Sequence, residues 1–283
     1  MPTATTREIV DAARRAGAGV GAFNVITLEH AEAIVAAAER AGRPVILQLS
    51  QNAVRFHHGR VHPVAAAMER VADASAVPVS LHLDHVNDED LLHQAADAGF
   101  SSVMFDASTR PYDDNLRATR AAAEWAHRHG LWAEAELGEV GGKDGAHAPG
   151  VRTDPGEAAA YVAATGVDGL AVAVGSSHAM ISRTAVLDLQ LVTALSRAVT
   201  VPLVLHGSSG VPDDQLRGAV RHGMVKVNIG TALNVAFTGA VREILAPPGH
   251  PTDPRKYLRA ARDAMADTAA HLIEVLATPR EAH

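Results

Sequence analysis

Three histidines stand apart because each follows a short apolar run of the kind that forms a buried strand. The chain has 16 histidines, so a histidine alone carries little information. Imidazole nitrogens from three separate strand ends can share one transition metal and leave a fourth position open for substrate. The sequence therefore predicts a three-nitrogen metal site. Its candidate ligands are His85 at the end of the run 77–85, His178 three residues after the run 169–175 and His206 at the end of the run 201–206.

Four carboxylates, Asp84, Asp106, Glu134 and Glu136, lie at the ends of similar runs. Around a metal, such groups serve as a fourth ligand, as an outer partner that orients an imidazole, or as a general acid or base. The residue types alone do not choose among these roles. Strict alternation along a strand puts Asp84 and His85 on opposite faces. We therefore expect the strand to twist or end between them, so that both side chains reach the same site.

Two turns rich in glycine and hydroxyl residues predict an anion site. The turn 207–210 directly follows the third histidine and leads at 211–214 into a helix, while 230–231 follows the next strand. Small residues let backbone N–H groups approach an anion, and a helix N-terminus adds a favourable dipole. In α/β barrels, the loops after the seventh and eighth strands are the usual phosphate site. The candidate cradle comprises Gly207, Ser208, Ser209, Gly230 and Thr231.

The elements that must position these residues alternate in type. Runs rich in valine, isoleucine and leucine alternate with alanine-rich amphipathic segments, at intervals of about 25 to 35 residues, as in a parallel barrel with crossover helices. The segments 28–41, 88–98 and 114–129 are expected helices. A doubly wound open sheet would use the same alternation, but no G-x-G-x-x-G follows the first strand. The predicted strands are 20–25, 45–50, 77–85, 101–106, 132–137, 169–175, 201–206 and 225–229.

The pattern predicts an α/β protein with a single (β/α)8 TIM barrel that takes up 1–283 as one domain. The segment 138–150 is glycine-rich, too long and too polar for a tight barrel turn, so we interpret it as a lid beside the site. A soft C-terminal tail is expected from 278.

The net charge and the residue types of the chain argue against some classes of function and of metal site. The net charge of −7 argues against a general nucleic-acid or anionic-membrane surface but allows a small basic pocket for a phosphorylated substrate. The chain has no cysteine, so a tightly held transition metal must sit on histidine or carboxylate. No run reaches the roughly 18 apolar residues of a membrane span, and the expected location is the cytoplasm.

With these motifs in place, the chain resembles the class II, metal-dependent fructose-bisphosphate and tagatose-bisphosphate aldolases. The resemblance covers nearly the whole length and keeps the order and spacing of many motifs. It implies a lyase of carbohydrate metabolism with dihydroxyacetone phosphate as nucleophile and a small aldehyde as acceptor. The motifs lie at 22–24, 82–85, 102–106, 134–138 with 141–142, 166–175, 206–210, 226–231 and 253–255.

The resemblance also assigns roles to individual residues. It implies one Zn²⁺ per chain on His85, His178 and His206, with Glu136 contacting the metal in some states, and it adds a monovalent cation as a further candidate cofactor. Asp84 resembles the acid/base at the aldehyde-derived oxygen, and Asn228 the amide that holds the enediolate. Arg255 resembles a residue that binds the far phosphate in a neighbouring subunit, which implies a homo-oligomer, a dimer or tetramer. The other substrate-binding positions are Asn24, Gln48, Ser50, Ala179, Gly207, Ser208, Ser209, Gly230 and Thr231.

The chain departs from the family pattern at three places. Ala179 stands where the family has a glycine, with Ile181 in place of an aromatic, and Ser208 replaces the middle glycine of the turn after His206. The lid has Asp144 where the family has a longer glutamate that moves the proton at the ketone carbon, and Glu139 is a possible substitute. These changes lie near the phosphate and the proton shuttle, so they suggest an unusual substrate or a slower enzyme.

Other functions remain as alternatives. A sister aldolase would act on another ketose phosphate or deoxy-sugar acid phosphate. A catalytically weak sugar-phosphate-binding barrel would keep the cradle, but the complete set of metal histidines opposes it. A zinc-dependent hydrolase barrel usually has His-x-His at the end of its first strand, where this chain has Phe23, Asn24 and Val25.

Overall fold

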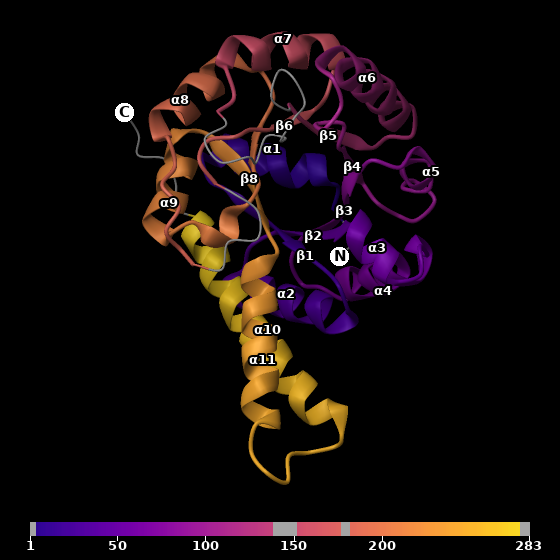
Figure 1. Cartoon of the computed structure of the whole chain (residues 1–283), viewed down its shortest axis with the longest axis vertical. Helices are drawn as coiled ribbons and strands as arrows, with labels where there is room; N and C mark the ends of the chain where they lie inside the picture. Colours follow the sequence, from indigo (N-terminus) through magenta and orange to yellow (C-terminus); the bar gives the residue numbers. More distant parts are fainter. Residues whose placement is uncertain (1–3, 138–151, 177–181, 278–283) are drawn as a thin grey trace.

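The computed structural model describes residues 4–137, 152–176 and 182–277. Within these residues, eight parallel strands form a closed barrel in which each strand pairs with its sequence neighbours and β8 closes onto β1 (Figure 1). The predicted (β/α)8 barrel is therefore confirmed. The strands are β1 Val20–Asn24, β2 Val45–Ser50, β3 Val79–Val86, β4 Ser102–Phe105, β5 Trp132–Glu136, β6 Gly169–Ala171, β7 Leu203–Leu205 and β8 Met224–Ile229.

Helices surround the barrel as an outer ring. The predicted helix 28–41 is correct to the residue, and 114–129 corresponds to a helix that begins two residues earlier and ends one earlier. The helices are α1 Thr6–Ala16, α2 Leu28–Ala41, α3 Gln51–Phe56, α4 Val61–Asp73, α5 Glu89–Leu92, α6 Tyr112–Arg128, α7 Pro155–Thr165, α8 Leu189–Ala198, the 3₁₀ turn η1 Ser208–Gly210, α9 Asp213–His222, α10 Thr231–Leu245 and α11 Pro254–Leu276.

Several predicted elements are shorter than expected, and the helix at 88–98 and strand β6 lose the most residues. The helix expected at 88–98 is regular only over α5, because several of the following amides bond to the carbonyl three residues back, as in Gln94 to Leu91. Strand β6 ends at Ala171, four residues before its predicted end. Beyond Ala171 the backbone has other hydrogen-bond partners. The amide of Ala173 donates to the hydroxyl of Thr153, and its carbonyl accepts from the amide of Thr153. The single-domain assignment stays a prediction, and the expected lid at 138–150 and tail from 278 lie outside the described residues.

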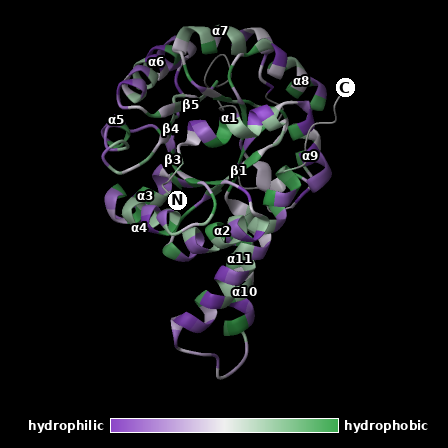
Figure 2. Cartoon of the chain, turned by 180° about the vertical axis from the view of Figure 1, so that it is seen from behind, coloured by the Kyte–Doolittle hydropathy of each residue, from purple (hydrophilic) through white to green (hydrophobic). Residues whose placement is uncertain are grey.

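The barrel interior has its own small apolar core at the amino ends of the strands. Helix α1 crosses this end of the barrel (Figure 2). Its buried Ile9 and Val10 belong to the same cluster as Ile46, Trp132 and Val204, which the strands supply. A separate and larger cluster fills the layer between the strands and the outer helices. The amino end is thus closed by packing, and chemistry is confined to the carboxyl end.

Above this apolar layer, the barrel interior becomes polar. Alternation along a strand sends residues two apart to the same face, so three strands each direct two polar side chains inward. All six side chains are buried. They are His82 and Asp84 on β3, Glu134 and Glu136 on β5, and Lys226 and Asn228 on β8.

Helices α10 and α11 form a hairpin whose far end extends beyond the barrel (Figure 1). Leu233 is the buried residue of α10, and Val235 on the same helix is 52% exposed. Within the described part of the chain, no helix combines the length and the apolar character needed to cross a membrane.

Candidate metal and substrate site

A local break in β3 brings Asp84 and His85 to the same site. The pairing of β3 with β4 shifts register between Leu83 and Val86, and His85 has a φ of 50°, in the left-handed region. Such a bulge adds one residue to a strand and re-aims the side chain at that position. A positive φ is costly for a residue other than glycine, and such strain concentrates at functional sites. Strand β3 was expected to twist or end between Asp84 and His85; it continues to Val86 and contains a bulge at this place.

Asp84, His85 and His206 form a cluster that can hold a metal ion. Each offers one ligand atom, and these atoms all lie within 4.8 Å of one another. His85 and His206 are two of the three predicted ligands, and Asp84 joins them. His178, the third, lies outside the described residues, as do Ala179, Asp144 and Glu139.

His85 and His206 each have a ring nitrogen within hydrogen-bond distance of a carboxylate. Nδ1 of His85 lies 2.8 Å from Oδ2 of Asp106, and Nε2 of His206 lies 3.0 Å from Oε1 of Glu134. Metal-ligating histidines almost always donate their second ring N–H to such a partner, which fixes the tautomer and the ring orientation. The other nitrogen of each ring is then the one suited to a metal. Oε2 of Glu136 lies 3.0 Å from Nδ1 of His206, the ring nitrogen that does not bond to Glu134.

The buried charges of the cluster shift one another's pKa values. Burial disfavours the charged form of Asp84, but the positive charge of His85 and a hydrogen bond from His82 outweigh it and hold the Asp84 pKa far below its ordinary value. Burial lowers the pKa of His85, yet the charge of Asp84 and the hydrogen bond to Asp106 raise it to about 10. The pKa of His206 is also raised, against burial, by its hydrogen bonds to Glu134 and Glu136. Without a metal, His85 therefore holds a proton near neutral pH that a metal must displace, and the raised pKa of His206 favours a proton on that ring as well.

A cavity of about 460 Å³ opens at this end of the barrel and contains most of the predicted substrate residues. The predicted residues on its wall come from both ends of the sequence. They are Asn24, Gln48, Ser50, Asp84, His85, Gly207, Ser208, Ser209, Asn228, Gly230 and Thr231.

The two turns of the predicted cradle lie side by side and bond to the strands beneath them. The Oγ of Ser208 donates to the backbone carbonyl of Asn228, so this hydroxyl ties the first turn to β8. The Oγ of Ser209 accepts from the amide of Ala232 in the first turn of α10, at 3.1 Å. A Cβ at Gly230 would lie 3.1 Å from the side-chain amide of Asn24, so glycine suits this close approach. The serine at 208 thus has a structural partner of its own.

Among the described residues predicted to bind substrate, Arg255 lies away from this cavity. The predicted metal residues His206 and Glu136 are buried and do not form part of its wall. Arg255 lies in the first turn of α11, at the far end of the hairpin, where it pairs with Asp253 at 2.7 Å. Its side chain is 86% exposed. A role for Arg255 in binding would therefore concern the site of another subunit.

Several residues in and below the cavity were not assigned a role from the sequence. Lys226 and His82 lie fully buried beneath the cavity floor. The available signal for Lys226 was a lysine two residues before Asn228 in an otherwise apolar strand, because such a position faces the barrel interior. The wall also includes Gln51, Asn52, Arg55, Asn87 and Asn234, which come from loops and helices after the strands.

A closed parallel barrel with a histidine and carboxylate centre beside an anion cradle, all at the carboxyl ends of the strands, defines a metal-dependent barrel enzyme. The family model described as "Fructose-bisphosphate aldolase class-II" matches residues 4–279. The chain belongs to this family. It is a metal-dependent aldolase, a lyase that breaks and forms carbon–carbon bonds by aldol chemistry.

Individual relatives agree with this assignment. A fructose-bisphosphate aldolase from Geobacillus stearothermophilus is 40% identical over 271 residues, which cover 95% of this chain and 94% of the relative. One from Staphylococcus aureus is 36% identical, with both chains fully covered. Among solved structures, the YdjI aldolase from Escherichia coli K12 superposes with a TM-score of 0.83 at 32% identity, covering 97% of each chain.

Proposed function

We propose that this enzyme cleaves and forms a ketose bisphosphate, with dihydroxyacetone phosphate as the nucleophile and a glyceraldehyde 3-phosphate-like aldehyde as the acceptor. The observation that carries the proposal is that Asp84 and His85 line one cavity with the 207–209 and 230–231 turns, while the buried His206 clusters with these two residues. A phosphate in the cradle would place the adjoining ketone near the cluster. The names of the fructose-bisphosphate aldolase relatives support the same substrate class.

The metal proposed for the site is Zn²⁺. His85, His178 and His206 would hold it, and Glu136 would contact it in some states. The donor set fits because imidazole nitrogens suit zinc and two of the rings already have carboxylate partners. When bound, the ion supplies Lewis acidity to the ketone carbonyl, so that the neighbouring C–H becomes acidic. A monovalent cation remains a further proposed cofactor, by family resemblance.

The protein groups then have separate tasks. The Asn228 amide, at the cavity wall, would donate a hydrogen bond to the enediolate oxygen as negative charge develops there. The Asp84 carboxyl would exchange a proton with the aldehyde-derived oxygen. Asp84 lies 3.3 Å from Nδ2 of Asn228, so both groups serve the same few atoms of substrate. Asp144 in the proposed lid, or Glu139, would move the proton at the ketone carbon.

The proposed assembly is a homo-oligomer, a dimer or tetramer, in which Arg255 binds the far phosphate in the neighbouring site. The projecting α10–α11 hairpin and the exposed Val235 support this arrangement. Because Arg255 is absent from the cavity of its own chain, a partner subunit has to bring it there. The proposed location is the cytoplasm.

A sister activity is the second candidate, and Arg55 favours it. Arg55 lines the cavity after β2, while the cradle lies after β7 and β8. Because Arg255 is the residue proposed for the far phosphate, a second cation at that place suits an acceptor that also carries a carboxylate. In this case the substrate would be another ketose phosphate or a deoxy-sugar acid phosphate.

The test is to incubate zinc-loaded protein with fructose 1,6-bisphosphate and to measure triose release, with and without a chelator. Release that stops on chelation supports the lyase on this substrate. Tight binding without turnover would support a sugar-phosphate-binding barrel instead. A panel of aldehydes offered with dihydroxyacetone phosphate then separates the two candidate substrates, and Arg55→Ala should raise KM selectively for acid-bearing acceptors.

A further inference from the structure

We propose that Lys226 is a positioning residue for the aldol reaction, because its buried ammonium fixes the side-chain amide of Asn228 with the NH₂ group toward substrate. The inference rests on the proposed function, in which that amide holds the enediolate. Lys226 makes no contribution to the cavity wall and so acts through Asn228 rather than on the substrate.

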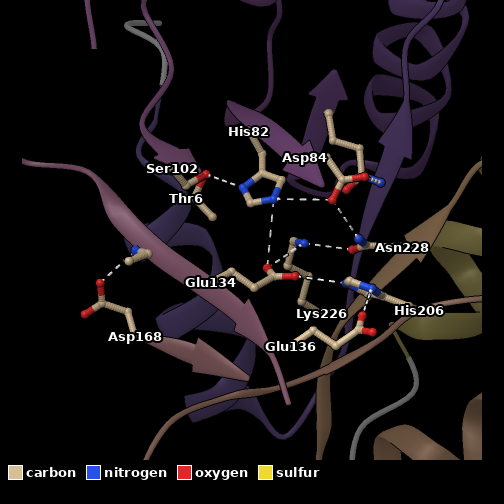
Figure 3. A network of polar contacts seen from close by, with 12 residues as sticks. Thr6, His82, Asp84, Ser102, Glu134, Glu136, Asp168, His206, Lys226 and Asn228 are labelled. Atoms are coloured by element: carbon tan, nitrogen blue, oxygen red, sulfur yellow. Dashed lines mark hydrogen bonds and ion pairs between the residues drawn. The ribbon is translucent and has the colours of Figure 1, made fainter. Parts of the chain in front are cut away.

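Lys226 has two close partners inside the barrel. Its Nζ donates to Oδ1 of Asn228 at 2.7 Å and lies 2.8 Å from Oε2 of Glu134 (Figure 3). The side chain is fully buried. A buried ammonium lowers the stability of the fold unless it is paired with an opposite charge. Glu134 supplies that charge here.

The chemistry of the ammonium decides which way the amide points. A lysine ammonium offers three donors and no acceptor, so only the oxygen of Asn228 can face it. The nitrogen must then face the other way, and Nδ2 lies 3.3 Å from Oδ1 of Asp84. The oxygen and nitrogen of the Asn228 amide are nearly equal in size, so without Lys226 the amide group can rotate. A rotated amide would place its oxygen, rather than a donor, against the developing negative charge.

Glu134 extends this arrangement to the metal site. One of its oxygens pairs with Lys226, and the other lies 3.0 Å from Nε2 of His206. A continuous series of contacts thus joins His206, Glu134, Lys226, Asn228 and Asp84. The metal ligand and the donor for the enediolate are therefore held by the same buried ion pair. A purely structural lysine would only neutralise Glu134, and its loss would lower stability or zinc affinity without changing turnover per bound zinc.

The decisive experiment is a double-mutant cycle with Lys226→Met and Asn228→Ala, measured as kcat per bound zinc. Removal of a donor to a developing oxyanion costs roughly 10²- to 10³-fold in kcat, so we expect Asn228→Ala to fall in that range. Lys226→Met should lose roughly 10- to 100-fold, the usual effect of changing an outer partner of a site, with KM little changed because the cradle is intact. The double variant should be no slower than Asn228→Ala alone. Additive losses, or an unchanged kcat per zinc in Lys226→Met, would overturn the proposal.

Tyr161→Phe serves as a matched control. Tyr161 is also buried and hydrogen-bonded, to Asn115 and Thr119, but lies outside the cavity. Its loss should lower thermal stability and leave kcat per zinc unchanged. If Lys226→Met does not fold, Glu134→Gln is added, so that no buried carboxylate is left without its counter-charge, and the cycle is run in that background.

A crystal of zinc-loaded parent protein tests the amide orientation without reference to turnover. Lys226 Nζ within hydrogen-bond distance of the Asn228 amide, and the far amide atom directed at bound dihydroxyacetone phosphate, is the expected result. Separation of Lys226 from Asn228 in that crystal would overturn the proposal. A parent protein that holds the amide in place but releases no triose would count against the proposed function alone.

Discussion

The Nδ1 atom of His85 lies 2.8 Å from Oδ2 of Asp106, a carboxylate that follows the neighbouring strand of the barrel. Asp106 is held in turn, because its Oδ1 accepts from the hydroxyl of Ser108 at 2.6 Å. His85 also has an unusual backbone, with a φ of 50° at the bulge of β3. The ring is thus oriented from two sides, by its own strained backbone and by a carboxylate that is itself fixed. This double constraint would hold the imidazole in position for the proposed metal.

Asp106→Asn should weaken zinc binding by roughly 10- to 100-fold, the usual loss when the outer partner of a ligating histidine is changed. The amide oxygen can still accept from His85, but it no longer carries the negative charge that makes the imidazole a better ligand. The measurement is zinc affinity by competition with a chromophoric chelator. Asp97→Asn, a change at an exposed carboxylate, is the control. Equal affinities for Asp106→Asn and parent would contradict the expected role.

Zinc uptake should release protons and become tighter as the pH rises. The pKa of His85 is raised to about 10 and that of His206 is raised as well, so at neutral pH the metal-free protein holds protons that zinc must displace. Calorimetric titration in buffers of different ionisation enthalpy measures the number released. A zinc-binding enthalpy that is independent of the buffer would contradict this prediction.

The same shift predicts how the metal-free protein responds to pH. A histidine whose pKa is raised in the folded state adds stability that is fully present below its unfolded value, near 6.5, and is lost as the pH rises toward about 10. Unfolding by urea between these two pH values should therefore show a decline that His85→Asn lacks. Parallel declines in both proteins would mean that other groups cause it.

The sequence could predict much of the site because strand order and alternation fix which side chains share the barrel interior. The ends of eight strands meet at one edge, so His85 and His206 could be placed together without a structure. The sequence could not show that β3 bulges at His85, because register depends on the pairing with β4. The sequence also could not show which role each carboxylate has. Asp106 and Glu134 lie beside imidazoles only because adjacent strands place them there, and Lys226 needed its partner on β5 to be understood.

Asp84→Asn should separate the two proton transfers of the reaction. The expected loss in carbon–carbon cleavage is roughly 10²- to 10⁴-fold, the usual contribution of a general acid or base. Because Asp84 is proposed to act at the aldehyde-derived oxygen, exchange of the dihydroxyacetone phosphate C–H with deuterated water should continue. Cleavage is followed by triose release and exchange by NMR, both normalised to bound zinc. Equal losses of cleavage and exchange would indicate that Asp84 instead transfers the proton at the ketone carbon.

Arg255→Ala should raise the KM for the bisphosphate while leaving the thermal stability nearly unchanged, since the side chain is 86% exposed and its ion pair with Asp253 lies at the surface. If Arg255 completes a neighbouring site, a mixture of Arg255→Ala and the metal-site variant His206→Ala should regain activity after the subunits exchange. In a mixed assembly, one site would combine an intact metal centre with an intact Arg255. Arg128→Ala, an exposed arginine on α6, should leave KM unchanged. A chain that sediments as a monomer while fully active, or mixed variants that stay inactive after exchange, would show that Arg255 has no role across an interface.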